Sequence, residues 1–220
     1  SSLTLPALAG TGRFQARLVV DKYKDDIYPG DEFIMNCPYT AAGTHLPDWT
    51  FMRPVYYQGE LLFWAFSKAH QQDTGGSLPG GYFPRAYDIH AEGLMIPAIK
   101  WAEKGKPNTH VQDLIMNNVR YPQAQRLDIE AMFASLKLAE ERMIKLVEKY
   151  GKETILTSID HLIDIMHKMV KSEIAGMPDG TYTSEAACDE DGTHPDKPVW
   201  VRCAMTIKGD ELTFDYSKSD

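Results

Sequence analysis

Residues 50–66 read TFMRPVYYQGELLFWAF, and this stretch decides the fold. Two runs rich in aromatic and aliphatic residues, 50–57 and 61–66, flank Gln58-Gly59-Glu60, a pattern that predicts a β-hairpin. The second run, LLFWAF, is apolar on both faces, so we expect it to form a central, buried strand. It leads directly into Lys68 and His70, whose side chains should therefore leave the end of a rigid strand.

The segments on either side of this hairpin predict an α+β protein. Residues 13–20 and 32–35 carry further strand signals, and helical spacing of apolar residues predicts helices over 122–150 and about 153–174. These helices should pack as an antiparallel hairpin, with Gly151 ending the first. Further strands are predicted at 181–187, 199–207 and 211–216. We therefore expect a mixed or antiparallel sheet region, a long helical hairpin, and then more antiparallel strands.

The same order of elements suggests three segments within one continuous region of a larger subunit. They are a β-rich segment over residues 1–108, which carries the candidate site, a helical segment over 109–177, and a β segment over 178–220. The chain begins SSLTLPALAG without a methionine and stops at FDYSKSD soon after a strand pattern. We therefore expect both ends to be cut from a longer polypeptide.

Composition excludes several classes of function. The net charge of −8 and the lack of a basic stripe disfavour nucleic acid as a partner. No apolar run approaches the roughly 18 residues of a membrane span, so we expect a cytoplasmic protein with no membrane partner. The three cysteines are far apart and form no CxxC pair, which indicates neither a disulfide framework nor a thiolate zinc site.

Ligand-type side chains crowd residues 69–93, AHQQDTGGSLPGGYFPRAYDIHAEG. His70 and Asp73 are three residues apart, so both can reach one cation if the backbone turns after the strand. The glycine pairs allow such a turn, because glycine adopts positive φ without strain. His90 returns seventeen residues after Asp73. The alternative for this HxxD pair is an ordinary surface histidine with a satisfied partner.

A second HxxD unit lies upstream, where His45 and Asp48 have the same separation. These two residues could instead belong to a turn in which Asp48 caps backbone donors and His45 is exposed. Together with His90, the two units supply three imidazoles and two carboxylates, enough for a site with open positions for water or substrate. Mixed nitrogen and oxygen ligands without sulfur suit Mn²⁺, Fe²⁺ or Zn²⁺.

Two cations flank this candidate site. Lys68 and Arg85 could neutralise an anionic substrate such as bicarbonate or a phosphorylated intermediate, although either could equally be a surface cation. The sequence contains no GxxxxGK[ST], no GxGxxG after a strand and no GxSxG. It therefore offers no evident site for nucleotide phosphates or dinucleotides, and no serine nucleophile.

Several motifs in order resemble those of the hydantoinase B family. They are GDEFIMNCPYTAAGTHLPDWT, SKAHQQDTGG, PGGYFPRAYDIHAEGLMIP, PDGTYTSEAACDEDG and GDELTFDYS, which together span nearly the whole chain. Within that family, AHQQDTGG followed by AYDIHAEG is most similar to the alpha subunit of acetone carboxylase. Hydantoinase and oxoprolinase relatives more often carry HHADIGG, and a tyrosine where His90 stands.

This resemblance implies a multisubunit ligase that joins acetone and bicarbonate to give acetoacetate at the expense of ATP. It implies that ATP binds a hydantoinase A-like partner subunit, that a small third subunit completes the assembly, and that the alpha subunit carries manganese, with zinc or iron as alternatives. Carried onto this sequence, the ligands would be His70 and Asp73, then His45 and His90.

Two other functions are compatible with the same sequence. The first is ATP-dependent opening of a hydantoin or oxoproline ring on the same scaffold. The second is a noncatalytic assembly module, in which the histidine and aspartate side chains only hold loops together. The residue types alone leave these alternatives open.

Overall fold

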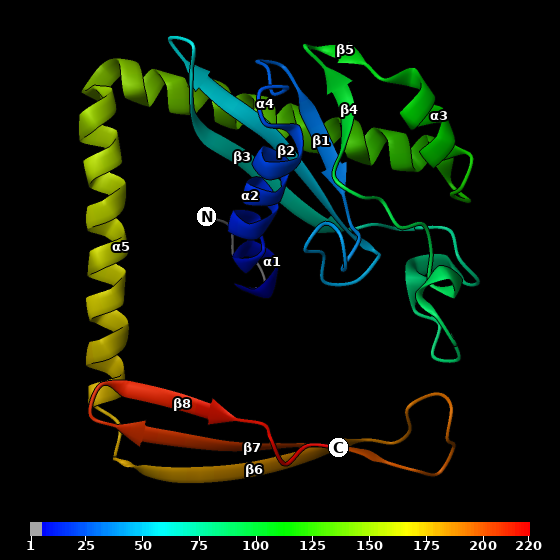
Figure 1. Cartoon of the computed structure of the whole chain (residues 1–220), viewed down its shortest axis with the longest axis vertical. Coiled ribbons are helices and arrows are strands. Elements are labelled where there is room, and N and C mark those ends of the chain that lie inside the picture. Colours follow the sequence, from blue (N-terminus) through cyan, green and yellow to red (C-terminus); the bar gives the residue numbers. More distant parts are fainter. Residues whose placement is uncertain (1–5) are drawn as a thin grey trace. The chain divides into compact units, whose positions relative to one another are not determined.

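The computed structural model describes the backbone of residues 6–220 and the side chains from Leu8 onward. The chain divides into two compact units, residues 1–146 and 147–220, each with its own β-sheet (Figure 1). All strand pairs are antiparallel, and helices accompany both sheets, so the predicted α+β class is confirmed. No helix in the described part of the chain is long and apolar enough to cross a bilayer.

A five-stranded sheet in the order β3-β2-β1-β4-β5 forms the centre of the first unit. The predicted hairpin is present, because β2 pairs with β3 across the turn at Gln58 and Gly59, both of which have positive φ. The strands are β1 (Glu32–Met35), β2 (Asp48–Tyr57), β3 (Glu60–His70), β4 (Ile99–Glu103) and β5 (Lys106–Pro107).

The prediction that LLFWAF is a central strand is wrong, because β3 lies at the edge of the sheet and is mostly half-buried. Its two faces are apolar for another reason. Phe63 packs against the core on one face of the sheet, whereas Trp64 and Phe66 pack against the core on the other face. Alternation along a strand sends successive side chains to opposite faces. The strand is apolar on both faces because an apolar core packs against each face, not because the strand is central in the sheet.

Residues 13–20, predicted as a strand, lie instead in helix α2 (Gly12–Tyr23), which follows the short helix α1 (Pro6–Gly10). The buried side chains of α2, Gln15 and Val19, are four residues apart, which is the spacing of one helix face. Val19 packs with Phe33 and Met52 in one apolar core. The apolar residues at the end of segment 13–20 were misleading because a helix can bury a β-branched residue such as Val19 as well as a strand can.

Helices α3 (Thr109–Met116) and α4 (Pro122–Tyr150) supply the core on the opposite face. Phe133 of α4 meets Phe51 of β2 edge to face, with ring centroids 5.4 Å apart. Arg53 of β2 pairs with Glu32 at 2.6 Å and with Glu140 of α4 at 2.9 Å. The buried guanidinium of Arg53 thus links the sheet to α4 through two carboxylates and fixes the position of α4.

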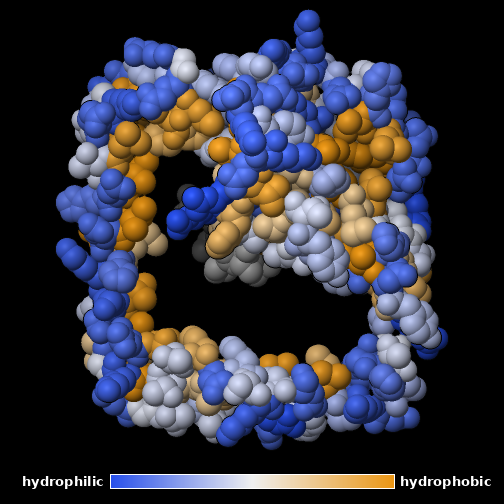
Figure 2. Space-filling view, viewed as in Figure 1, coloured by the Kyte–Doolittle hydropathy of each residue, from blue (hydrophilic) through white to orange (hydrophobic). Residues whose placement is uncertain are grey.

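The second unit contains helix α5 (Lys152–Ala175) and a three-stranded sheet in the order β6-β7-β8. Its strands are β6 (Gly180–Cys188), β7 (Val199–Lys208) and β8 (Glu211–Asp215). Apolar side chains gather along one side of α5 (Figure 2), and none of the residues of this helix is buried. Both predicted helices are present and meet at Gly151, where φ is +86°. Their packing as a hairpin stays a prediction.

Candidate metal centre

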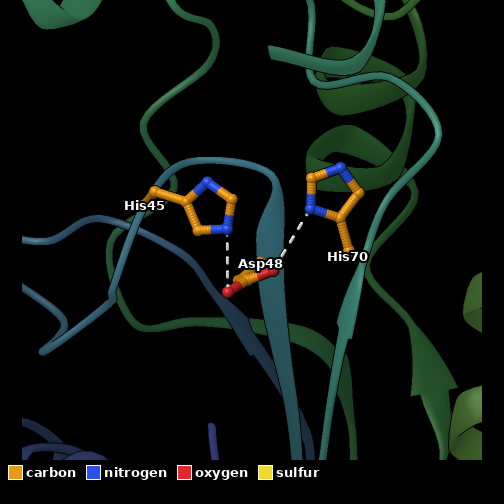
Figure 3. Close-up of side chains that lie close together, drawn as sticks. All are labelled: His45, Asp48 and His70. Carbon is orange, nitrogen blue, oxygen red and sulfur yellow. Dashed lines mark ion pairs between the residues drawn. The ribbon is translucent and has the colours of Figure 1, made fainter. Parts of the chain in front are cut away.

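Three ligand-type side chains converge at one end of the β2–β3 hairpin (Figure 3). The Nε2 atom of His45 lies 2.9 Å from Oδ2 of Asp48, and the Nδ1 atom of His70 lies 3.4 Å from Oδ1 of the same carboxylate. One ligand atom from each residue can be chosen so that all three lie within 4.8 Å of one another. The two HxxD units of the sequence therefore meet through Asp48.

Strand register places two of these residues opposite each other. Asp48 is the first residue of β2 and His70 is the last residue of β3, and the two are direct cross-strand partners. His45 reaches the same point through a tight turn, in which the Asp48 amide donates to the His45 carbonyl at 3.1 Å. Pro47 holds this turn against the next segment, because the Gln71 amide donates to its carbonyl at 2.7 Å.

The donor set fits a divalent cation. Metal–ligand bonds of about 2.1 Å place neighbouring ligand atoms about 3.0–3.4 Å apart. Each imidazole nitrogen lies at about this distance from its own oxygen of Asp48, and one ligand atom from each of the three residues lies within 4.8 Å of the other two. Asp48 is 5% exposed, whereas the side chains of His45 and His70 are 34% and 40% exposed. The carboxylate is thus held in place, and the imidazoles leave a route from solvent. Thr44 Oγ1 also donates to Asp48 Oδ2 at 2.9 Å, which fixes that oxygen further.

Lys68 lies on the same face of the sheet as this cluster. It precedes His70 by two residues on β3, and its cross-strand partner is Thr50, two residues after Asp48. Its ammonium donates to Thr11 Oγ1 at 3.3 Å. Burial lowers the pKa of Lys68 below its usual range, and the charge of Asp48 offsets part of this shift.

Asp73, which the sequence predicts as a ligand, has a different partner in this structure. Its carboxylate is fully buried and accepts from the Arg120 amide at 2.5 Å and from Arg120 Nη1 at 2.8 Å. The same guanidinium donates to the carbonyls of Gly75 at 3.2 Å and Gly76 at 2.6 Å. Asp73 and Arg120 therefore brace the glycine-rich loop, and Asp73 lies outside the three-residue cluster.

The glycines of this loop are required by close packing as well as by backbone conformation. Gly75 and Gly76 have φ of +77° and +73°, and a Cβ atom added to either would lie 2.5 Å from backbone atoms of Asn118 or Glu92. Neither position can accept a side chain without displacement of its neighbours. The backbone after His70 is thereby held tightly to two other segments.

The remaining predicted residues, His90 and Arg85, are exposed, and His90 lies outside the cluster. His90 is exposed in the short 3-10 helix η2 (Ile89–Ala91), where its amide donates to Asp88 Oδ1 at 2.9 Å. Arg85 is exposed in the loop before η2. The ligand role of His45, His70, Asp73 and His90 and the substrate role of Lys68 and Arg85 stay predictions.

The ligand set implied by the family resemblance omits Asp48, although the count of ligand-type residues in the two HxxD units includes it, and Tyr82 was not considered at all. Asp48 belongs to an HxxD unit, yet only cross-strand register reveals that it faces His70. Tyr82 was missed, and its ring stacks on His70 with centroids 5.4 Å apart and planes 14° apart. The preceding pair Gly80-Gly81 was a usable signal, because it marks a backbone that approaches other segments closely.

Comparison with known proteins assigns the family. A sequence model described as hydantoinase B/oxoprolinase matches residues 2–220. The chain belongs to the hydantoinase B/oxoprolinase family. A Pseudomonas sp. (strain NS671) protein that is named as a component of a D-/L-hydantoinase is 34% identical over 203 residues, which cover 90% of this chain and 34% of that protein. The family expected from the ordered motifs is thus confirmed.

Solved structures with the same fold include a caprolactamase and an acetone carboxylase. The ATP-dependent caprolactamase from Pseudomonas jessenii aligns with a TM-score of 0.85 and 31% identity, covering 93% of this chain and 35% of the other. Nucleotide-free acetone carboxylase aligns with a TM-score of 0.83 and 18% identity, covering 97% of this chain and 29% of the other. The second likeness shows the fold alone. This member of the hydantoinase B/oxoprolinase family spans about a third of the length of these relatives.

Proposed function

We propose that this chain is the cation-binding region of a larger subunit in an ATP-dependent enzyme that acts on a carbonyl compound. The observation that carries the proposal is the convergence of His45, Asp48 and His70 at the end of the β2–β3 hairpin. Membership of the hydantoinase B/oxoprolinase family supports it. In this proposal ATP binds a hydantoinase A-like partner subunit, and a small third subunit completes the complex.

The residues of the site have distinct roles in this proposal. His45, Asp48 and His70 hold a divalent cation, Mn²⁺ with Zn²⁺ or Fe²⁺ as alternatives, which supplies Lewis acidity toward a carbonyl or carboxylate oxygen. Lys68 lies on the same sheet face and receives an anionic oxygen of the substrate. Arg85 is a second substrate-binding candidate, because its exposed guanidinium stands on the loop that follows the site.

The first candidate reaction is ATP-dependent opening of a cyclic amide ring. It is favoured by the identities above 30% with relatives named as hydantoinase and caprolactamase. In such a reaction, polarisation of the amide carbonyl makes its carbon more electrophilic, and ATP makes ring opening thermodynamically favourable. Lys68 would then stabilise the negative charge that develops on oxygen.

The second candidate reaction is the joining of acetone and bicarbonate to give acetoacetate. It is favoured by the succession of AHQQDTGG and AYDIHAEG, in which His90 stands where ring-opening relatives more often have tyrosine. In this reaction the site would hold the enolate of acetone and an activated carboxylate close together, so that the carbon–carbon bond forms within one pocket.

Elemental analysis of the purified full-length complex tests the cation site. We expect about one divalent cation for each copy of the site in the wild type and a loss of bound metal in Asp48→Asn, because a neutral amide is a poorer ligand than a carboxylate. His161→Gln is the matched control, since His161 is exposed on α5 and belongs to neither ligand set. Anomalous scattering across the metal edge in crystals locates the ion.

Asp73→Asn, added to the same measurement, separates the rival ligand sets. Full metal retention in Asp48→Asn together with loss in Asp73→Asn would favour the ligands predicted from the sequence over those that the geometry brings together. A wild-type complex that carries no stoichiometric transition metal would contradict the proposal and favour a noncatalytic assembly module.

Omission of bicarbonate distinguishes the two reactions. Ring opening of a hydantoin, oxoproline or caprolactam should continue with ATP alone, whereas carboxylation of acetone should stop. Product analysis with each substrate, with and without bicarbonate, therefore decides between them.

A further inference from the structure

Tyr82 covers the two imidazoles of the candidate metal centre. Its ring lies nearly parallel to that of His70, at an interplanar angle of 14° and a centroid distance of 5.4 Å. The same ring lies 5.8 Å from the His45 centroid, and the two imidazoles are 5.4 Å apart. Three aromatic rings therefore form one cluster beside the Asp48 carboxylate.

The loop that carries Tyr82 is docked on the turn that carries the ligands. Gly81 has φ of +69° and is buried, and a Cβ atom added there would lie 2.5 Å from Pro47 Cγ. Pro47 lies between His45 and Asp48, so contact at Gly81 fixes the distance between the loop and the ligand turn. Gly80, with φ of +80°, gives the backbone the turn that precedes this contact.

Hydrogen bonds close the base of the same loop. The Ser77 amide donates to the Ala91 carbonyl at 2.8 Å, and the Leu94 amide donates to the Thr74 carbonyl at 2.8 Å. The loop is thus anchored at its base and again at Gly81. Tyr82 is 66% exposed despite these anchors. Because the Tyr82 ring is largely exposed, its position over the imidazoles depends on the anchored backbone of its loop and not on burial of the ring itself.

Stacking on an imidazole face is compatible with ligation. A metal binds an imidazole nitrogen in the plane of the ring, whereas Tyr82 occupies the face of His70 and leaves Nδ1 directed toward Asp48. The side chains of His45 and His70 are about a third or more exposed, so burial alone does not fix their χ2 angles. A flat ring in contact with both restricts that rotation and excludes water from one side of the site.

We propose that Tyr82 is a positioning residue of the cation site, which holds His45 and His70 in the ligating orientation and slows release of the bound cation. This inference rests on the proposed cation-binding function and extends it to a residue outside the ligand set. The contact is made by the ring face, so the aromatic ring and not the phenol hydroxyl carries the role.

Release of Mn²⁺ from the full-length protein tests the role of Tyr82. The protein is loaded with Mn²⁺ and mixed with excess EDTA, and the loss of the protein-bound electron paramagnetic resonance signal gives the release rate. We expect Tyr82→Ala to release the ion at least about tenfold faster than the wild type, which corresponds to about 1.4 kcal/mol. Tyr82→Phe should stay within about twofold of the wild type, because it keeps the ring.

Tyr87→Ala is the matched control, because Tyr87 belongs to the same loop and is 90% exposed. Its release rate should equal that of the wild type. A second variant, Gly81→Ala, should reproduce the Tyr82→Ala rate, because a methyl group at positive φ and against Pro47 displaces the loop.

Each other outcome has a separate meaning. A wild type that binds no cation overturns the proposed function itself. A wild type that holds Mn²⁺ while Tyr82→Ala releases it at the same rate overturns only the inference about Tyr82. Equally fast release from Tyr82→Ala and Tyr82→Phe also overturns it, because the hydroxyl would then carry the effect. Fast release from Tyr87→Ala overturns it as well, since any change in the loop would then suffice.

Discussion

The two units of this chain use their β-sheets in different ways. The five-stranded sheet has an apolar core on each face and holds buried polar groups such as Asp48 and Arg53, and the loop after β3 holds the buried Asp73. In the second unit, the buried apolar side chains among the described residues are Ile207 of β7 and Val147, which lies near the end of α4. Charges such as Lys171 and Asp210 pair there at the surface.

This difference explains where a chemical site can form. A carboxylate surrounded by packed side chains interacts strongly with its neighbours, because the surroundings are less polarisable than water. It also keeps a fixed geometry, because close packing leaves its element no freedom to shift. Exposed ion pairs of the second unit, such as Lys171–Asp210, interact weakly in water and are not held in a fixed geometry. The candidate centre accordingly lies at the end of the sheet that has a core.

The largest expected difference between the two sheets is in the free energy of unfolding lost when one phenylalanine ring is removed from each. Phe51→Ala should lower the free energy of unfolding by about 4 kcal/mol, because Phe51 is fully buried and the substitution leaves a cavity. Phe214→Ala should change it by about 0.5 kcal/mol or less, because Phe214 is 52% exposed. Urea unfolding followed by tryptophan fluorescence and circular dichroism measures both. Equal losses would show that the second sheet is more deeply covered than this structure indicates.

A smaller difference in the free energy of unfolding is expected when one ion pair is broken in each unit. Arg120→Ala should cost about 3 kcal/mol, because it leaves the buried Asp73 carboxylate without its charged partner. Lys171→Ala, which removes an exposed partner of Asp210, should produce no measurable change in unfolding. Chemical denaturation of the two variants gives the comparison. Arg120→Lys is the control for charge, since it keeps the cation but loses the bonds to the Gly75 and Gly76 carbonyls.

The smallest effect is a difference in the pH dependence of stability. Burial lowers the pKa of Lys100, but hydrogen bonds to Asp31 and Asp26 outweigh burial and raise the pKa above its usual value. The folded state therefore keeps this proton to higher pH than the unfolded chain does. The stabilisation is complete below the unfolded pKa of about 10.4 and is lost as pH rises through the raised value.

Lys100→Met tests this pH dependence. The wild type should exceed the variant by about 1–2 kcal/mol at pH 9, and the difference should shrink at higher pH. Lys171→Met is the matched control in the second unit. Its pKa is also raised, by a hydrogen bond from its ammonium to Asp210, but both groups are exposed. Urea unfolding at several alkaline pH values measures both variants, and a constant difference for Lys100→Met would contradict the assignment.

Local patterns predicted regular elements well where periodicity was long. The helix expected over residues 122–150 is α4 with the same bounds. Short patterns were less reliable: the four-residue strand expected over 32–35 is β1, but two other short patterns were misread. Residues 13–20 form a helix because Gln15 and Val19 share one buried face, and LLFWAF lies at a sheet edge because apolar cores cover both faces there.

In the candidate site, too, the sequence determined one part and the contacts between distant segments determined another. The sequence alone determined which residue types are present: two HxxD units, a glycine-rich loop and ordered motifs that indicate the family. Only the tertiary structure decided their partners. Cross-strand register places Asp48 against His70, and Arg120, 47 residues beyond Asp73, donates to the Asp73 carboxylate. Spacing along a chain limits which side chains can meet, but strand pairing and close packing between distant segments determine which of them do.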